Sequence, residues 1–143
     1  MLARFTPPRW FVAAALAVSM AACTIPISYY DATTYRTLTD LKVDATELVG
    51  SFDSVTVVNA EPAIGGTRTR LLKAVEYEKG KGKDNTDTAK QMELILEIYD
   101  RDVTAYRASG PNRRQRTYQE LAIQLAQAFD IAIATEASKN KDK

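Results

Sequence analysis

The chain has 143 residues, with 19 lysines and arginines against 18 aspartates and glutamates, one cysteine and no histidine. A net charge of +1 creates no strong positive field, so we expect no nucleic-acid partner. The lack of histidine removes the most frequent general base and the most frequent transition-metal ligand. Only carboxylate chemistry or the binding of a hard cation would then remain, and we expect no enzyme, no bound metal ion and no cofactor.

Residues 1–22 have the features of a secretory signal peptide. Arg4 and Arg9 precede an apolar run of small residues that extends from Trp10 to Ala22. A charged start, a short apolar run and small residues before a cleavage point are typical of such peptides. The run of about 13 residues is shorter than the roughly 20 that a membrane-spanning helix needs. Loss of Arg4 and Arg9 with this peptide would change the net charge from +1 to about −1.

The apolar run ends in Met20-Ala21-Ala22-Cys23, and Cys23 is the only cysteine of the chain. These four residues resemble the lipobox of bacterial lipoproteins, although that family usually has leucine at the position of Met20. The resemblance implies cleavage before Cys23, acylation of its thiol, as with palmitate, and acylation of the new amino terminus. Two or more acyl chains anchor a protein stably, whereas one binds only marginally.

The residue after the cysteine is Thr24. An aspartate there would resemble the signal for retention in the inner membrane, so the resemblance implies an outer-membrane anchor with the domain facing the periplasm. Exposure at the cell surface is the alternative for its location. The alternative for the motif is an ordinary signal peptide followed by an incidental cysteine.

Residues 23–30 form a short link between Cys23 and the domain. Seven residues from Thr24 to Tyr30 span about 25 Å at most when fully extended, so the domain would lie close to the lipid surface. Tyr29 and Tyr30 can lie at the level of the headgroups, where amphipathic rings are favoured. We favour the alternative, in which both rings pack on the start of the first helix.

From about Asp31 to Val58 the apolar positions predict one long helix. They are separated alternately by four and three residues, which is a heptad pattern. Its members are Thr34, Leu38, Leu41, Ala45, Leu48, Phe52 and Val55. A helix of about 27 residues would be about 40 Å long. We expect the pattern to face the core of an intramolecular bundle, and a coiled coil with another chain is the alternative.

Residues 61–66 contain one proline and two adjacent glycines, which predict a turn. A short helix is expected from Thr67 to about Lys79. Residues 80–85 begin with alternating glycine and lysine, but they lack the spacing of a phosphate-binding loop, so we interpret them as a solvated polar loop.

Two further long helices complete the predicted bundle. Residues 88–91 match a capping box and predict a helix that ends at about Ala108. After a turn, the last helix is expected from about Arg113 to Ala137, followed by a charged, frayed tail at 139–143. The predicted fold is an all-α antiparallel bundle of three long helices and one short one over residues 31–138.

Both of the last two helices carry apolar residues outside their main apolar face. These residues are Leu94, Ile98 and Ala105 on one helix and Ile123, Ile131 and Ala134 on the other. A surface helix normally has one apolar stripe. A second stripe indicates either a helix buried on both sides at the centre of the bundle, which we favour, or a surface that binds a partner.

Four arginines surround the turn between these helices, namely Arg107, Arg113, Arg114 and Arg116. Guanidinium groups bind phosphate and carboxylate well. The candidate partners are lipid headgroups, lipopolysaccharide, cell-wall carboxylates or an acidic protein. The alternative is a solvated loop, although these cations oppose the dipole of the helix that follows.

Paired carboxylates at i, i+4 spacing occur at Glu93 and Glu97 and at Asp40 and Asp44. Acid–base chemistry would require burial of such a pair, and these residues alternate with the apolar stripe and are expected to face water. We therefore expect a structural or accessory lipoprotein that binds another envelope protein. A carrier of a lipid or another apolar ligand in the bundle is the alternative, and the oligomeric state remains open.

Overall fold

The computed structural model describes residues 28–111 and 117–141. These residues form four α-helices and one short 3-10 helix. They are α2 (Ala32–Ser51), α3 (Val57–Gly80), η1 (Lys83–Asn85), α4 (Thr86–Ser109) and α5 (Tyr118–Ser138). The predicted signal peptide, Cys23 and the segment 112–116 lie outside the described residues. Within the described ranges there is no strand.

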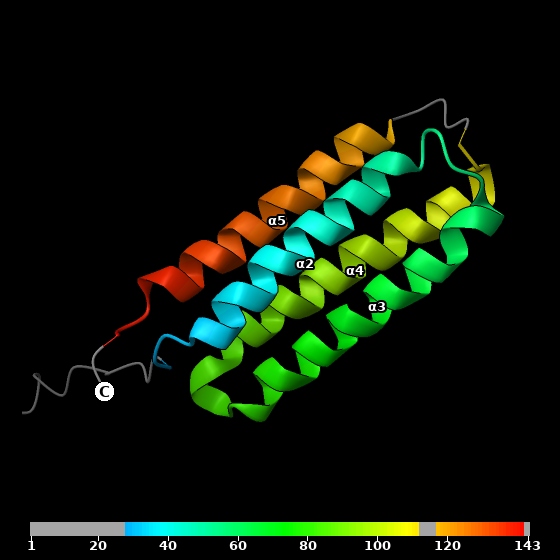
Figure 1. Ribbon diagram of the computed structural model, residues 1–143. Coiled ribbons are helices and arrows are strands. Elements are labelled where there is room, and N and C mark those ends of the chain that lie inside the picture. The colour runs from blue at the N-terminus through cyan, green and yellow to red at the C-terminus, as the bar shows by residue number, and fades with distance from the viewer. Residues whose placement is uncertain (1–27, 112–116, 142–143) are drawn as a thin grey trace, which may run out of the picture.

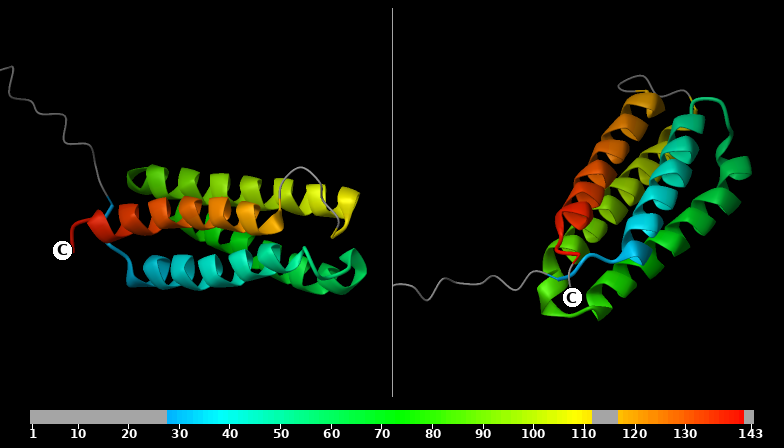
Figure 2. Two further views of the ribbon diagram at one scale, coloured as in Figure 1. Left: turned by 90° about the horizontal axis from the view of Figure 1, so that it is seen from above. Right: turned by 60° about the vertical axis from the view of Figure 1, so that its left-hand side comes forward.

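The four helices form an antiparallel bundle in which consecutive helices are neighbours (Figure 1). Helix α2 packs most extensively on α5, and α4 packs on both α3 and α5. Among neighbouring pairs, α2 and α3 make the least contact. The described chain begins and ends at the same end of the bundle, where blue meets red in Figure 2. We call this end the base and the opposite end the far end. The all-α antiparallel bundle is thus confirmed.

The core contains the predicted main faces of α2, α4 and α5. Leu38, Ala45 and Phe52 are at most 1% exposed. At the far end the ring of Phe52 stacks on Tyr106, with centroids 3.9 Å apart, and Tyr118 meets both rings edge-on. Buried phenols need hydrogen-bond acceptors, and here backbone carbonyls supply them. Tyr106 donates to the carbonyl of Val55 and Tyr118 to that of Gly110.

The predicted end of the first helix and the turn after it were wrong. Helix α2 ends at Ser51, and α3 begins at Val57 and continues through Pro62 and the two glycines at 65 and 66. The bundle therefore has four long helices rather than three long helices and one short one. Proline inside a helix costs one backbone hydrogen bond. Burial of Ile64, which is 0% exposed, and of other core residues along α3 outweighs this cost.

Two further helix starts differ from the prediction. Thr88 does not cap α4, because the helix already begins at Thr86 and Thr88 is buried within it. Helix α5 begins at Tyr118 rather than near residue 113, and its capping box is formed by Thr117 and Glu120. In the part of the chain that the structure describes, none of the helices has both the length and the apolar character required to cross a membrane.

Candidate functional site

The second apolar stripe of α4 and α5 lies largely on the surface. Leu94 is 53%, Ile123 58% and Ile131 60% exposed. Ile98 is partly buried and packs against the core. The favoured interpretation, in which both helices are covered on two sides, was therefore wrong for the three exposed residues. Large apolar side chains on neighbouring exposed positions are typical of surfaces that bind partners.

A hydrogen bond between α4 and α5 fixes the relative level of two of these residues. The amide nitrogen of Gln91 donates to the hydroxyl of Thr135 over 2.9 Å. Leu94 lies one turn after Gln91 on α4, and Ile131 lies one turn before Thr135 on α5, on the same side of its helix in each case. Because the two helices are antiparallel, both steps lead toward the far end. They therefore lie at the same height across the boundary between the helices. We call Leu94, Ile98 and Ile131 the α4–α5 face.

The outer side of α5 carries little charge. Between Leu121 and Thr135 the only charged residue is Asp130, and its carboxylate pairs with Lys42 of α2 over 2.5 Å. Ile123 lies two turns from Ile131 toward the far end, on the side of α5 that faces α2, where it lines a hollow together with Gly50. An apolar partner would therefore cover this side of α5 without having to desolvate an unpaired charge.

Of the four arginines of the predicted cluster, only Arg107 lies within the described residues. Arg107 already pairs with Glu61 of α3, through hydrogen bonds of 2.7 and 2.8 Å from its guanidinium to the two carboxylate oxygens. The hydrogen bond from Arg107 lowers the pKa of the Glu61 carboxyl. Arg113, Arg114 and Arg116 lie outside the described residues, so the four arginines stay a prediction.

Surface carboxylates of the bundle, among them Glu93 and Asp44 of the predicted pairs, are held in ion pairs between helices. Three of these pairs join Glu93 to Lys79, Asp44 to Arg70, and Asp100 to Arg68. Ion pairs at the surface lack the burial that separates the pKa values of catalytic carboxylates. Among the described residues, no group of histidine, cysteine and carboxylate side chains is arranged to hold a metal ion.

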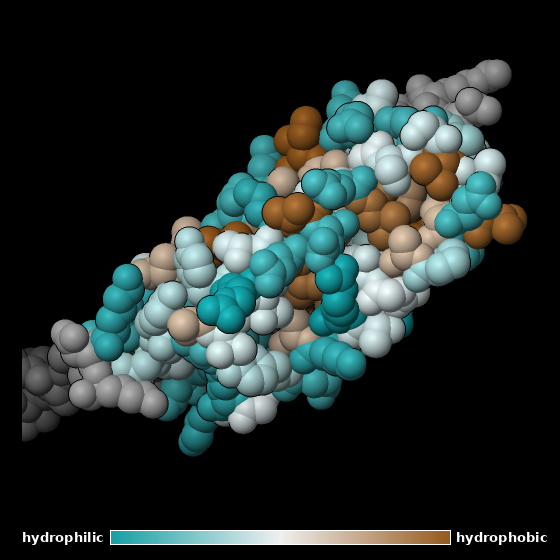
Figure 3. All heavy atoms as spheres, in the orientation of Figure 1, coloured by the Kyte–Doolittle hydropathy of each residue, from teal (hydrophilic) through white to brown (hydrophobic). Residues whose placement is uncertain are grey.

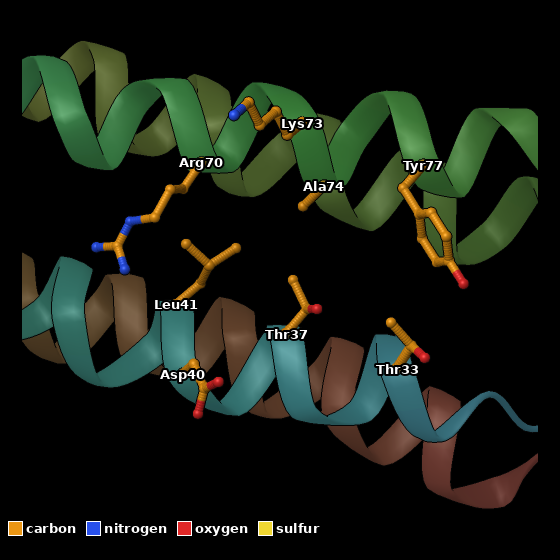
Figure 4. A pocket seen from close by; sticks show the side chains of 8 residues that line it. All are labelled: Thr33, Thr37, Asp40, Leu41, Arg70, Lys73, Ala74 and Tyr77. Atoms are coloured by element: carbon orange, nitrogen blue, oxygen red, sulfur yellow. The ribbon is translucent and has the colours of Figure 1, made fainter.

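A shallow groove of about 390 Å³ lies between α2 and α3, the pair of neighbours with least contact (Figure 4). Its floor contains Leu41 of α2 and Ala74 of α3, which are 3% and 8% exposed. In Figure 4, Arg70 extends from α3 toward α2, where it pairs with Asp44. At the other end the hydroxyl of Tyr77 donates to Asp31. Polar bridges between the two helices thus close the groove at both ends.

The base contains a buried polar cluster that the sequence analysis missed. Asn85, which is 1% exposed, is at its centre. Its amide nitrogen donates to a carboxylate oxygen of Glu78 over 2.7 Å. Its amide oxygen accepts from Lys139 over 2.8 Å and from the hydroxyl of Ser28 over 2.9 Å. This single side chain therefore joins the end of α3, the end of α5 and the link before α2.

Two lysines neutralise carboxylates within this cluster. The ammonium of Lys81 lies 2.7 Å from a carboxylate oxygen of Asp31 and 3.1 Å from one of Glu78, and it also contacts the hydroxyl of Thr34. Lys139 pairs with Glu136 over 2.5 Å. We call these side chains the base cluster, namely Ser28, Asp31, Thr34, Glu78, Lys81, Asn85, Glu136 and Lys139.

The cluster shifts the titration of its members and changes two sequence-based expectations. Burial of the Asp31 carboxyl would raise its pKa, but hydrogen bonds from Lys81, Tyr77 and the Thr33 amide hold the pKa well below its ordinary value. The loop 80–85 ends in a buried residue rather than being fully solvated. The predicted frayed tail begins with Lys139, which is only 8% exposed.

The sequence contains one signal for this cluster. Near the end of both α3 and α5, a glutamate is followed three residues later by a lysine. These pairs are Glu78 with Lys81 and Glu136 with Lys139. Such i, i+3 pairs are common on exposed helix surfaces, so the spacing alone does not indicate burial.

Comparison of the chain with protein-family models, curated proteins and solved structures finds no match.

Proposed function

We propose that this protein is a lipoprotein anchored in the bacterial outer membrane, and that its helical bundle is a non-enzymatic accessory that binds another envelope protein in the periplasm. The α4–α5 face is the proposed binding surface. The observation that carries this proposal is the exposure of Leu94 and Ile131 at one height on neighbouring helices, next to a side of α5 with little charge.

The anchor is supported by the motif Met20-Ala21-Ala22-Cys23 at the end of a short apolar run. Acylation would confine the bundle to a membrane surface, where a partner in the same membrane meets it at high effective concentration. A modest binding surface is then sufficient for a lasting complex.

The binding surface is supported by the free energy available from burying it. Full burial of a leucine or isoleucine side chain contributes about 1.5 to 3 kcal/mol. A stable interface covers about 800 Å² on each partner. The α4–α5 face would therefore form its apolar centre, and surrounding polar residues would form its rim.

The alternative of a carrier with a ligand in the bundle core has less support. Large side chains fill the interior, among them Tyr99, Tyr106 and Phe129, which are all 0% exposed. The groove between α2 and α3 lies at the surface, and its volume of about 390 Å³ is near the lower limit for a small-molecule site.

The test is crosslinking in intact cells, purification through a carboxy-terminal tag and identification of the crosslinked protein by mass spectrometry. We expect a stoichiometric partner with the natural chain and none with the double variant Leu94→Asp, Ile131→Asp. The matched control is Val43→Asp, Val58→Asp, which changes residues that are 53% and 81% exposed elsewhere on the bundle. Loss of the partner in the control as well, or its retention in the double variant, would exclude the α4–α5 face.

The anchor is tested in parallel with Cys23→Ser. This variant is expected to leave the membrane fraction as a soluble or uncleaved form, because no thiol remains to be acylated. A variant that is still cleaved and still bound to the membrane would contradict the lipoprotein proposal. If the natural chain is anchored but yields no partner, the accessory role fails, and ligand carriage becomes the hypothesis to pursue.

A further inference from the structure

The link before α2 is fastened to the base of the bundle rather than extending freely from it. The amide of Ser28 donates to the carbonyl of Asp84 over 3.0 Å, and its hydroxyl donates to Asn85 over 2.9 Å. Two residues later, the amide of Tyr30 donates to the carbonyl of Asn140 over 3.0 Å. The link is therefore held between the start of α4 and the end of the described chain.

A fourth contact closes this attachment. The amide of Asp31 donates to Glu136 over 2.6 Å, and the other carboxylate oxygen of Glu136 pairs with Lys139. Both of these side chains are nearly inaccessible, at 0% and 6% exposure. Since a buried charge pair is costly to open, the link and the bundle should move as one body.

The distance from this attachment to Cys23 is short. Five peptide units separate Cys23 from Ser28, and five residues span at most about 18 Å when fully extended. The far end lies about 36 Å from the base, because α3 has 24 residues with a rise of about 1.5 Å each. An acyl anchor at Cys23 therefore brings the base, and not the far end, to the membrane surface.

The base presents side chains that suit lipid headgroups. Tyr29 is 50% exposed, although both of its neighbours in the chain are hydrogen bonded to the bundle. The ring of Tyr30, by contrast, lies 6.2 Å from Tyr35 and 5.2 Å from the ammonium of Lys141. A tyrosine with an apolar ring and a polar tip is favoured at the interface between lipid and water. Lys83 is exposed at the same end and can pair with a lipid phosphate.

The side of the bundle formed by α2 and α3 suits a membrane less well than the base does. In Figure 3, which shows the side formed by α2 and α3, hydrophilic side chains are spread over much of the surface, and the hydrophobic ones gather toward the far end. This side also carries ion pairs such as Arg70 with Asp44, which would lose water if they were pressed against lipid.

We propose that the bundle stands end-on on the membrane, with its base seated against lipid headgroups and Tyr29 in contact with them. This inference rests on the proposed anchor at Cys23, and it adds a second contact surface that is separate from the α4–α5 face. The acyl chains hold the protein at the membrane, and the base cluster determines its orientation there.

Tryptophan fluorescence tests this orientation. The only tryptophan of the chain is Trp10, which precedes Cys23 and would be lost with the signal peptide. A single tryptophan can therefore be placed at the base with Tyr29→Trp or at the far end with Val58→Trp, where the natural residue is 81% exposed. A third probe, Ile123→Trp, reports on the flank of α5.

Each variant is purified in its lipidated form and placed in vesicles of phosphatidylethanolamine and phosphatidylglycerol that carry a nitroxide quencher on the headgroup. We expect the emission of Tyr29→Trp to be quenched and shifted to the blue relative to detergent solution. The emission of Val58→Trp and Ile123→Trp should be unchanged. Circular dichroism of each variant verifies that the bundle is folded.

Flotation of the vesicles separates the two proposals. If all variants float and Tyr29→Trp is quenched no more than Val58→Trp, the end-on inference is wrong while the anchor stands. Stronger quenching of Ile123→Trp than of Tyr29→Trp would show that the bundle lies on its side and would equally overturn the inference. If the protein does not float, the anchor fails and the inference fails with it.

Discussion

The buried ammonium of Lys139 provides a direct test of the base cluster. Its side chain is 6% exposed and contacts the carboxylate of Glu136 and the amide oxygen of Asn85. The substitution Lys139→Met keeps the length and apolar stem of the side chain but removes the charge. Glu136, which is 0% exposed, would then keep the hydrogen bond from the Asp31 amide and lose its counter-ion.

The size of the effect follows from leaving that carboxylate without its counter-ion. Removing one partner of a buried ion pair costs about 3 to 5 kcal/mol of the free energy of unfolding. For a domain of this size, 1 kcal/mol corresponds to about 4 °C in the melting temperature. The melting temperature of Lys139→Met should therefore fall by about 12 to 20 °C.

The assay is urea and thermal unfolding of the mature chain carrying Cys23→Ser, followed by circular dichroism at 222 nm. The matched control is Lys141→Met, which removes the same charge from an exposed position at the same end. It loses only the contact of its ammonium with the Tyr30 ring and should change stability by less than about 1 kcal/mol. A cost of less than about 1 kcal/mol would mean that the ammonium of Lys139 is hydrated in the natural chain. The conclusion that the tail and the link are fastened to the base would then have to be abandoned.

Two further predictions concern α2 and α3. Asp31→Asn keeps the helix cap but removes the charge of a carboxyl whose pKa is lowered in the folded protein. The stability that this charge contributes is therefore present above the ordinary carboxyl pKa of 3.8 and is lost as the pH falls below it. Urea unfolding should show a cost of the substitution at pH 7 that shrinks at about pH 3, and a cost that does not depend on pH would contradict this. Gly65→Ala and Gly66→Ala should each raise the free energy of unfolding by about 0.5 to 1 kcal/mol, because both lie inside α3 with open space around an added Cβ. A loss of stability would instead favour a turn at 61–66.

The sequence predicted the fold class and most of the core because the spacing of apolar residues along a helix follows from which of its sides is buried. The heptad pattern in α2 and the main faces of α4 and α5 coincide largely with the buried residues. The same pattern overran the real end of α2, since Phe52 and Val55 continue the spacing while lying in the turn that leads to α3. Spacing alone does not distinguish a core residue on a helix from a core residue in the turn after it.

Segment 61–66 was misread because local and tertiary preferences disagree there. Proline and adjacent glycines disfavour a helix locally. Ala60, Ile64 and Leu71 nevertheless continue the spacing of a buried face on both sides of Pro62, and all three are at most 3% exposed. Val58, whose carbonyl loses the amide of residue 62 as a partner, is 81% exposed, so water can satisfy that carbonyl.

The candidate surfaces could be predicted only in part. The residues of the second apolar stripe were identified from spacing, but whether a helix is covered on one side or two depends on its neighbours in the bundle. The base cluster was missed because its contacts join positions up to 105 residues apart. Charged residues are normally exposed, so nothing local indicates that these are buried.

The up-and-down arrangement gives the protein the geometry of a spacer of fixed height. If the base rests on the bilayer, Leu94 and Ile131 lie about 12 Å above it, and the far end lies about 36 Å above it. Because straight packed helices resist bending, this height is set by the number of helical turns and not by the linker. A partner would then be selected by the elevation of its own docking surface above the membrane as well as by its chemistry. Inserting one turn into all four helices between the base and Leu94 would raise the α4–α5 face by about 5.4 Å while leaving every contact residue unchanged.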